Sequence, residues 1–282
     1  MDRFSQSVTA QDFVQNPYPA YDRARATGDL VHWDAYDMPA AMSHRAVRLL
    51  LTSRALGRTP PPGLAPPRLD HIKTWQQVED HSMLELEPPT HTRLRKLVLR
   101  AFTGKRVAAM GDQISAAAHH LIDQFPETPF DFLNRFARPL PVTVIANLLG
   151  VPLDRTDDLL RWSNAMVAMY QSGRDHTVEQ TAERASQDLV AYLDDVIAHR
   201  RRTPGPDLIT ELIAAEEDGD KLSGAELTST VILLLNAGHE ATVHTLGNAV
   251  QILAPLAPTP VTDTLVEELL RFDPPLHIFT RW

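Results

Sequence analysis

The chain of 282 residues contains no cysteine. Disulfide bonds, thiolate metal ligands and cysteine nucleophiles are therefore excluded for these residues. Long hydrophobic runs are also missing, because the most apolar stretch, residues 231–235, is far shorter than the about 20 apolar residues that cross a bilayer as a helix. The first residues, MDRFSQSVTAQDF, carry charges without the apolar run of a signal peptide. We therefore expect a cytoplasmic protein without a membrane partner.

Basic residues are scarce relative to acidic ones, with 27 Lys and Arg against 36 Asp and Glu, and the formal net charge is -9. Because nucleic-acid binding needs clustered positive charge, this balance argues against a nucleic-acid partner. Hydrophobic residues make up 43% and charged residues 22% of the chain, which is ordinary for a globular protein of a size that buries a core.

Helical patterns dominate, and strand signals are few and short. Ser43 can cap a helix, and Ser223 with Glu226 forms the S-x-x-E pattern of a capping box. Residues 60–67 (PPPGLAPP) must be an extended loop, because proline fixes φ and lacks a backbone donor. The sequence predicts a mainly α fold with minor β, with helices over residues 90–104, 138–152 (closed by Gly150), 157–168, 180–199, 223–250 and 263–272.

The first candidate site lies at the start of the helix predicted over residues 90–104. His91 and Arg95 are four residues apart at the edge of its apolar stripe, whereas Arg93, Lys96 and Arg100 fall on the opposite face, where water can solvate them. A cation held against apolar surface is costly unless it meets an anion or stays partly wet. The pair therefore suits a buried carboxylate or phosphate. From the residues alone, an arginine that reaches past the core edge beside an ordinary histidine is the favoured alternative.

The second candidate site is residues 237–242 (AGHEAT), in the middle of the longest predicted helix. Glycine there costs roughly 1 kcal/mol relative to alanine, so Gly238 indicates close approach of a ligand or of another backbone. The alternative is a tight helix crossing, with Glu240 paired to a base. His239 and His244 are five residues apart rather than the four of the zinc-peptidase motif, and we predict no metal site.

A third motif is the pair Glu268 and Arg271, three residues apart on the last predicted helix. Such charges can pair, and on a surface the pair contributes little to stability. Taken alone, a solvated ion pair is the favoured interpretation.

These motifs occur in an order that resembles a known family. Residues 16–21 (NPYPAY), 86–95 (LEPPTHTRLR), 235–242 (LNAGHEAT) and 268–275 (ELLRFDPP) resemble the opening segment, the C helix, the oxygen-activating I helix and the K helix of bacterial cytochromes P-450. Each motif is weak alone, but together and in register over the whole chain they are specific. The resemblance implies a cytochrome P-450-like fold, as a single truncated domain over residues 1–282 with the C-terminal part missing.

The resemblance also implies roles for individual residues. His91, Arg95 and Arg281 would contact haem propionates, and Ala237 and Gly238 would line the groove where dioxygen binds.

Glu240 would belong to the proton-delivery pathway, with Ala241 and Thr242 as its catalytic neighbours. Family members usually carry threonine directly after this acid, and here that position is Ala241, with Thr242 one residue later. Glu268 and Arg271 would form the buried structural pair that supports the haem-binding core.

The sequence ends at Trp282, before the glycine-rich loop that carries the proximal cysteine in this family. That thiolate favours O–O cleavage, so we expect no thiolate-ligated haem and no activity in this chain. The parent reaction would be monooxygenation of a small organic substrate, with electrons from a ferredoxin-type donor. The alternative is a haem-free P-450-like partner protein of the kind that assists glycosyltransferases. Apolar surface left uncovered should favour self-association.

Overall fold

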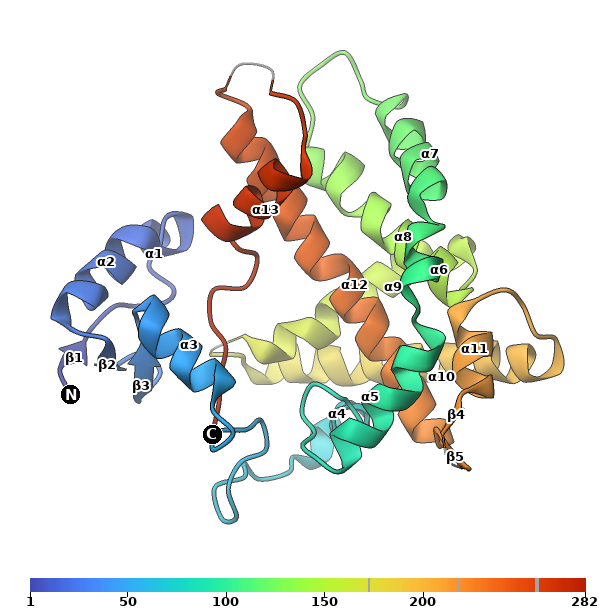
Figure 1. Cartoon of the computed structure of the whole chain (residues 1–282), viewed down its shortest axis with the longest axis horizontal. Helices are drawn as coiled ribbons and strands as arrows, with labels where there is room; N and C mark the ends of the chain where they lie inside the picture. Colours follow the sequence, from blue (N-terminus) through green and yellow to red (C-terminus); the bar gives the residue numbers. More distant parts are fainter. Residues whose placement is uncertain (172, 218, 257–258) are drawn as a thin grey trace. The chain divides into compact units, whose positions relative to one another are not determined.

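The computed structural model describes residues 1–171, 173–217, 219–256 and 259–282 (Figure 1). The described residues are mainly helical with two small sheets, which confirms the predicted fold class. They form two compact units, which we call unit 1 (Met1–Ala65 with Thr280–Trp282) and unit 2 (Pro66–Phe279). The expectation of a single domain stays a prediction. None of the described helices is both long and apolar enough to cross a bilayer.

Unit 1 is built on a three-stranded sheet in which the middle strand pairs in parallel with one neighbour and antiparallel with the other. The side chain of Trp33 lies at the centre of its core, with its ring 5.4 Å from Phe4 and 5.9 Å from Phe13, both edge-on. The Trp33 indole donates to the carbonyl of Gln6 at 2.9 Å, so its one polar atom is satisfied. In chain order the elements are β1 (Arg3–Phe4), α1 (Gln11–Gln15), α2 (Tyr18–Thr27), β2 (Leu30–Trp33), β3 (Met38–Ala41) and α3 (His44–Thr52).

The last residues of the chain belong to unit 1. Trp282 donates its backbone N–H to the carbonyl of Gly57 at 2.9 Å, and Gly57 donates to Trp282 at 3.2 Å. Arg58 adds hydrogen bonds to the backbone and the hydroxyl of Thr280, at 3.0 Å and 2.8 Å. Residues 280–282 are therefore fastened to the segment that follows α3.

Unit 2 holds the remaining elements around one hydrophobic core. The long helix α12 contacts α8, α9, α10 and α11, and its first half is buried among them (Figure 1). The elements in chain order are η1 (Asp70–Ile72), α4 (Lys73–Glu79), α5 (Thr90–Ala101), α6 (Gly104–Ala108), α7 (Gly111–Ile122), the π-helix η2 (Leu133–Ala137), α8 (Pro139–Leu149), η3 (Leu153–Arg155), α9 (Thr156–Val167), η4 (Ala168–Tyr170), α10 (His176–Arg202), α11 (Leu208–Ala214), β4 (Glu216–Glu217), β5 (Asp220–Lys221), α12 (Gly224–Leu253) and α13 (Asp263–Phe272).

The predicted caps are present where their partners are close in sequence. Ser43 accepts from the N–H of Ala46, which starts α3. At the start of α12, both capping-box bonds form, from Ser223 to Glu226 and back. Gly150 ends α8 with φ at +82°, a left-handed conformation that glycine adopts without penalty.

Five of the six predicted helices differ from the observed helices by one to four residues at one end or both, and two of these differences have a clear local cause. The helix predicted over residues 90–104 ends at Ala101, and Gly104 instead begins α6. The helix predicted from residue 180 begins at His176, because Asp175 caps it by accepting from the N–H of Val178 at 2.9 Å. The first turn of α10 lacks an apolar stripe, so hydrophobic periodicity could not detect it.

Candidate functional site

The middle of α12 has a buried face and an exposed face. Leu235, His239 and Val243 are buried, each four residues from the next. Ala237 and Ala241 are exposed, also four residues apart, and Thr242 beside them is exposed. The candidate residues of this helix are therefore divided between the two faces.

Gly238 faces another helix. A Cβ atom at this position would lie 2.9 Å from both Cγ1 and Cδ1 of Ile145, on α8. Real Cβ contacts are essentially never so short, so the glycine allows α8 and α12 to pack closely. The tight helix crossing therefore accounts for Gly238, and Ala237 on the exposed face remains the candidate for lining a ligand groove.

Glu240 lies between two histidines. Its Oε1 is 3.6 Å from Nε2 of His239, and its Oε2 is 3.4 Å from Nε2 of His244. Interaction with His239 and then with His244 lowers the pKa of Glu240 to about 2, although burial acts in the opposite direction. In return, Glu240 raises the pKa of His244. Glu240 is thus an ionised carboxylate near neutral pH, and the base that pairs with it is supplied by its own helix.

The two histidines differ in their access to solvent. The side chain of His239 is 1% exposed and its Nδ1 lies 2.9 Å from the carbonyl of Leu235, whereas the side chain of His244 is 59% exposed. His244 is therefore the member of this group that can exchange a proton with water. The hydrogen bond to Glu240 also raises the pKa of His244 above its ordinary value.

The hydroxyl groups near Glu240 point back along the helix. Thr242 donates to the carbonyl of Gly238 at 3.4 Å, and Thr245 donates to the carbonyl of Ala241 at 2.8 Å. Both bonds are of the i to i-4 kind that threonine makes inside helices. The position directly after Glu240 is Ala241, which has no hydroxyl to offer.

On α5, His91 is half-buried and Arg95 is exposed. Within the described residues neither side chain has a hydrogen-bond or ion-pair partner, so both remain available to an anion. Because Arg95 is solvated, it fits the alternative interpretation, an arginine that reaches past the edge of the core, and not a cation held against apolar surface. Leu94 and Leu97 form the buried stripe beside them.

The prediction that Arg93 is solvated is wrong. Its guanidinium lies 3.2 Å from Asp220 on β5 and forms an ion pair with Glu226 of the capping box. Helical spacing places Arg93 opposite the apolar stripe, but it cannot show that the start of α12 packs against that face. Arg93 therefore joins α5 to the N-terminus of α12.

Glu268 and Arg271 are paired as predicted, through two hydrogen bonds of 2.7 Å each. The predicted burial is wrong for this chain, because 53% of the Glu268 side chain and 68% of the Arg271 side chain are exposed. Helix α13 contains no fully buried residue, so the rest of unit 2, as described, does not cover the pair. The solvated ion pair is the correct interpretation here.

The predicted anion-binding residues belong to both units. His91 and Arg95 lie in unit 2, whereas Arg281 is a half-buried residue of unit 1. The guanidinium of Arg95 and the imidazole of His91, both on α5, suit the carboxylates of a haem. No thiolate can come from a chain without cysteine, however, so the residues present do not fit the axial ligation of a haem-thiolate centre.

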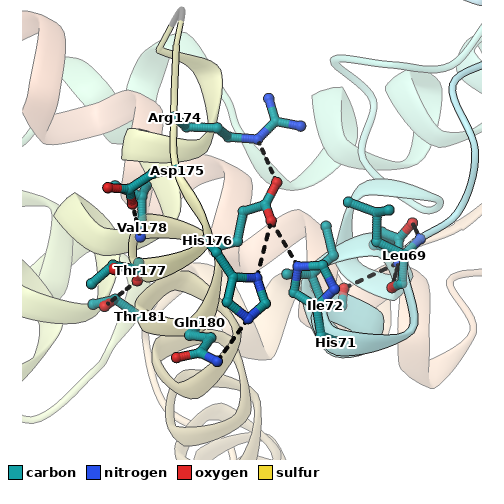
Figure 2. A network of polar contacts seen from close by, with 12 residues as sticks. Leu69, His71, Ile72, Arg174, Asp175, His176, Thr177, Val178, Gln180 and Thr181 are labelled. Carbon is teal, nitrogen blue, oxygen red and sulfur yellow. Dashed lines mark hydrogen bonds and ion pairs between the residues drawn. The ribbon is translucent and has the colours of Figure 1, made fainter.

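A separate polar cluster was not predicted from the sequence. His71 of η1 meets His176 and Glu179 of α10, with ligand atoms all within 4.8 Å of one another (Figure 2). The spacing of His176 and Glu179, three residues apart on a helix, is the part of this cluster that the sequence could have indicated. His71 comes from a distant segment and could be placed only by the fold.

Comparison with known proteins identifies relatives over most of the chain. The family model for cytochrome P-450 matches residues 65–255. Cytochrome P-450 107B1 of Saccharopolyspora erythraea is 41% identical over 203 residues, which make up 69% of this chain and 48% of that protein. Vitamin D(3) 25-hydroxylase of Pseudonocardia autotrophica is 36% identical over 286 residues, covering 94% of this chain and 66% of that protein. The chain thus spans about half to two thirds of the length of these relatives.

Solved structures agree with the sequence relatives. P450BioI, in complex with an acyl carrier protein ligated to hexadec-9Z-enoic acid, matches with a TM-score of 0.82 at 28% identity. That match covers 94% of this chain and 70% of P450BioI. The cytochrome P-450 PksS of Bacillus subtilis 168 matches with a TM-score of 0.76 at 28% identity, over 93% of this chain and 68% of that one.

Proposed function

Because the chain belongs to the cytochrome P-450 family, we propose that it forms the oxygen-binding side of a haem-dependent monooxygenase acting on a small organic substrate. In this family haem supplies the oxygen activation, and a ferredoxin-type donor would supply the electrons. The observation that carries the proposal is the ionised Glu240 between two histidines, next to exposed Ala237 and Ala241 on the central helix. By themselves, the 282 residues would not catalyse the reaction, because they contain no thiol.

Within this function, Glu240 and His244 would belong to the proton-delivery pathway. His244 is exposed and exchanges protons with solvent, and Glu240, whose pKa is lowered to about 2, stays ionised near neutral pH and stabilises the protonated imidazole of His244. A positioned acid or base of this kind contributes about a hundredfold or more to a rate. Ala241 leaves the adjacent position without a hydroxyl, so the substrate or a water molecule would have to supply one.

The test is the spectrum of the reduced carbon-monoxide adduct after haem is added to the purified chain. We expect no red-shifted Soret band, because histidine or methionine ligation gives a different axial field from thiolate. A red-shifted band from the purified chain, free of any longer enzyme, would contradict this expectation.

A second protein tests the positive half of the proposal. The chain is fused to the cysteine-bearing remainder of Vitamin D(3) 25-hydroxylase, which is similar over 94% of this chain. We expect the fusion to bind haem and give the red-shifted band. A folded fusion that binds no haem would contradict the proposal and favour a haem-free partner protein.

A further inference from the structure

Three potential metal ligands meet where η1 packs against the first turn of α10 (Figure 2). Nε2 of His71 lies 2.7 Å from Oε2 of Glu179, and Nδ1 of His176 lies 3.8 Å from the same oxygen. The two imidazole rings are in contact, with centroids 4.5 Å apart. The cluster lies within unit 2 and shares no residue with the candidate site on α5 and α12.

The separations between these atoms suit a small metal ion. Ligands about 2.1 Å from a tetrahedral zinc ion are about 3.4 Å from one another. The two separations from Glu179, 2.7 Å and 3.8 Å, lie on either side of that value, and the third, between the two histidines, is within 4.8 Å. Small rotations of exposed imidazoles would therefore bring His71, His176 and Glu179 to the required distances. Two imidazole nitrogens and one carboxylate oxygen are a donor set that zinc prefers, with a fourth position left to water.

The neighbouring residues orient this donor set. Arg174 donates from Nε to Oε1 of Glu179 at 3.3 Å and from Nη1 to the carbonyl of Met169 at 3.1 Å. The Glu179 carboxylate thus contacts Arg174 through Oε1 and the two histidines through Oε2. The charge of Arg174 opposes a cation, but it also fixes the carboxylate in a binding orientation.

Gln180 can fix the tautomer of His176. The amide nitrogen of Gln180 lies 2.9 Å from Nε2 of His176, so as placed it donates to that ring nitrogen. A half-turn of the amide would bring its carbonyl oxygen to the same position, where it accepts the Nε2–H and leaves the lone pair of Nδ1 for a metal. Partners of this kind on the second ring nitrogen are the rule for metal-binding histidines.

The two segments that supply the ligands are held together by a second contact. Glu183, one turn further along α10, accepts the backbone N–H groups of Thr74 and Trp75 at 2.9 Å to 3.1 Å. The start of α10 and the segment from η1 to α4 thus form one fixed corner, and a metal ion there would meet a largely preformed site.

From this geometry we propose that His71, His176 and Glu179 bind a divalent transition-metal ion, with Zn²⁺ as the first choice. The ion would fasten η1 to the first turn of α10. The proposal does not depend on haem or on monooxygenase activity.

Isothermal titration of the metal-free 282-residue chain with Zn²⁺ tests the proposal. We expect one tight site per chain, with binding weakened at least about tenfold in His71→Ala, in His176→Ala and in Glu179→Gln, since even outer-shell partners contribute about 10–100-fold. Addition of Co²⁺ in place of Zn²⁺ should give visible absorption bands of a tetrahedral site, which the same three variants lose.

His120→Ala is the matched control. His120 lies four residues before Gln124, with its Nε2 2.8 Å from the Gln124 amide, as His176 lies before Gln180. This control should bind Zn²⁺ as the unaltered chain does. Absence of a tight site in the unaltered chain would overturn the proposal, and so would equal Zn²⁺ affinity in all four variants. Circular dichroism checks that each variant is folded, and Glu179→Gln, which keeps the size of the side chain, serves if an alanine variant is not.

Discussion

At the scale of single residues, Glu240 combines a half-buried position with two histidine neighbours. Its lowered pKa means that the carboxylate stabilises the fold above its unfolded value of about 4.3, and that this contribution is lost as pH falls toward 2. The raised pKa of His244 means that its contribution to the stability of the fold is complete below about pH 6.5. This contribution is lost as pH rises through the pKa that His244 has in the folded protein. The pair of Glu240 and His244 therefore stabilises the fold most between about pH 4.3 and 6.5.

The first prediction is that Glu240→Gln lowers the pKa of His244 toward its ordinary value, because the negative charge that favours imidazolium is removed. Titration of the His244 ring signal by NMR measures this change. The loss in urea midpoint relative to the unaltered chain should be larger at pH 5.5 than at pH 9. Glu127→Gln, which removes a loop carboxylate, is the control and should leave the His244 titration unchanged. An unchanged titration in Glu240→Gln would show that the pair does not form.

Residue roles on α12 and α5 were predictable only in part. The sequence contains the run AGHEAT, and helical periodicity places Ala237 and Ala241 on one face. It does not show that Ile145 occupies the space beside Gly238, or that Arg93 rather than Arg95 finds carboxylate partners. Both facts depend on which helices cross, and that information lies in residues far away along the chain.

At the scale of elements, helix α4 depends on a carboxylate from another helix. Its own N-cap residue, Ile72, provides no side-chain cap, and Glu183 of α10 accepts from the first N–H groups instead. Burial raises the pKa of Glu183, but hydrogen bonds from Thr74, Trp75 and Gln187 outweigh it, so the net pKa is lowered. The carboxylate thus acts as an N-cap supplied across a helix contact.

The second prediction is that Glu183→Gln destabilises the protein by about 1–2 kcal/mol at pH 7, because a charged acceptor at the start of α4 is replaced by a neutral one. Since the folded pKa is lowered, the contribution is present above about pH 4.3 and disappears as pH falls below it. Urea unfolding at pH 7 and pH 3.5 measures both effects. Hydrogen exchange of the Thr74 and Trp75 amides should also become faster.

Glu127→Gln again serves as the control, because Glu127 is an exposed loop residue. A loss of stability in Glu183→Gln that is the same at both pH values would contradict the role of the ionised carboxylate. Equal stability of Glu183→Gln and the control at pH 7 would do the same.

Helices whose caps and breaking residues are close in sequence were predicted well. Helices that depend on a residue far away along the chain were not. Helix α13 begins and ends where predicted, at Asp263 and Phe272, because an N-cap precedes it and prolines follow it. Helix α4 was not predicted, because it has seven residues and a cap from α10. The burial expected for Glu268 and Arg271 came from the resemblance to a longer family fold, and the described residues do not provide the cover.

At the scale of the whole molecule, α13 presents apolar side chains to solvent. Val266 and Leu270 are four residues apart and 42% and 38% exposed, and Phe272 at the end of the helix is 56% exposed. Adjacent exposed apolar side chains of this kind favour contact with another molecule.

The third prediction is that the purified 282-residue chain self-associates into a dimer or a larger species, as light scattering at increasing protein concentration would show. The double variant Val266→Lys with Leu270→Lys should shift the chain toward the monomer, because lysine places charge on the apolar surface of α13. Val14→Lys, on the exposed side of α1, is a control that should leave the mass unchanged. A monomeric unaltered chain at high concentration would refute the prediction.

The return of residues 280–282 to Gly57 has a consequence for the order in which the molecule is made. Unit 1 is discontinuous, and the whole of unit 2 lies between its two parts along the chain. During synthesis the first 65 residues leave the ribosome before any of unit 2, yet their partners Thr280 and Trp282 are made only after unit 2. Closing so long a loop has an entropy cost that grows only slowly with its length, and folding of the intervening helices shortens the distance to be spanned. We therefore expect unit 1, although its first part is translated before unit 2, to acquire its hydrogen bonds to residues 280–282 only after unit 2 has been made.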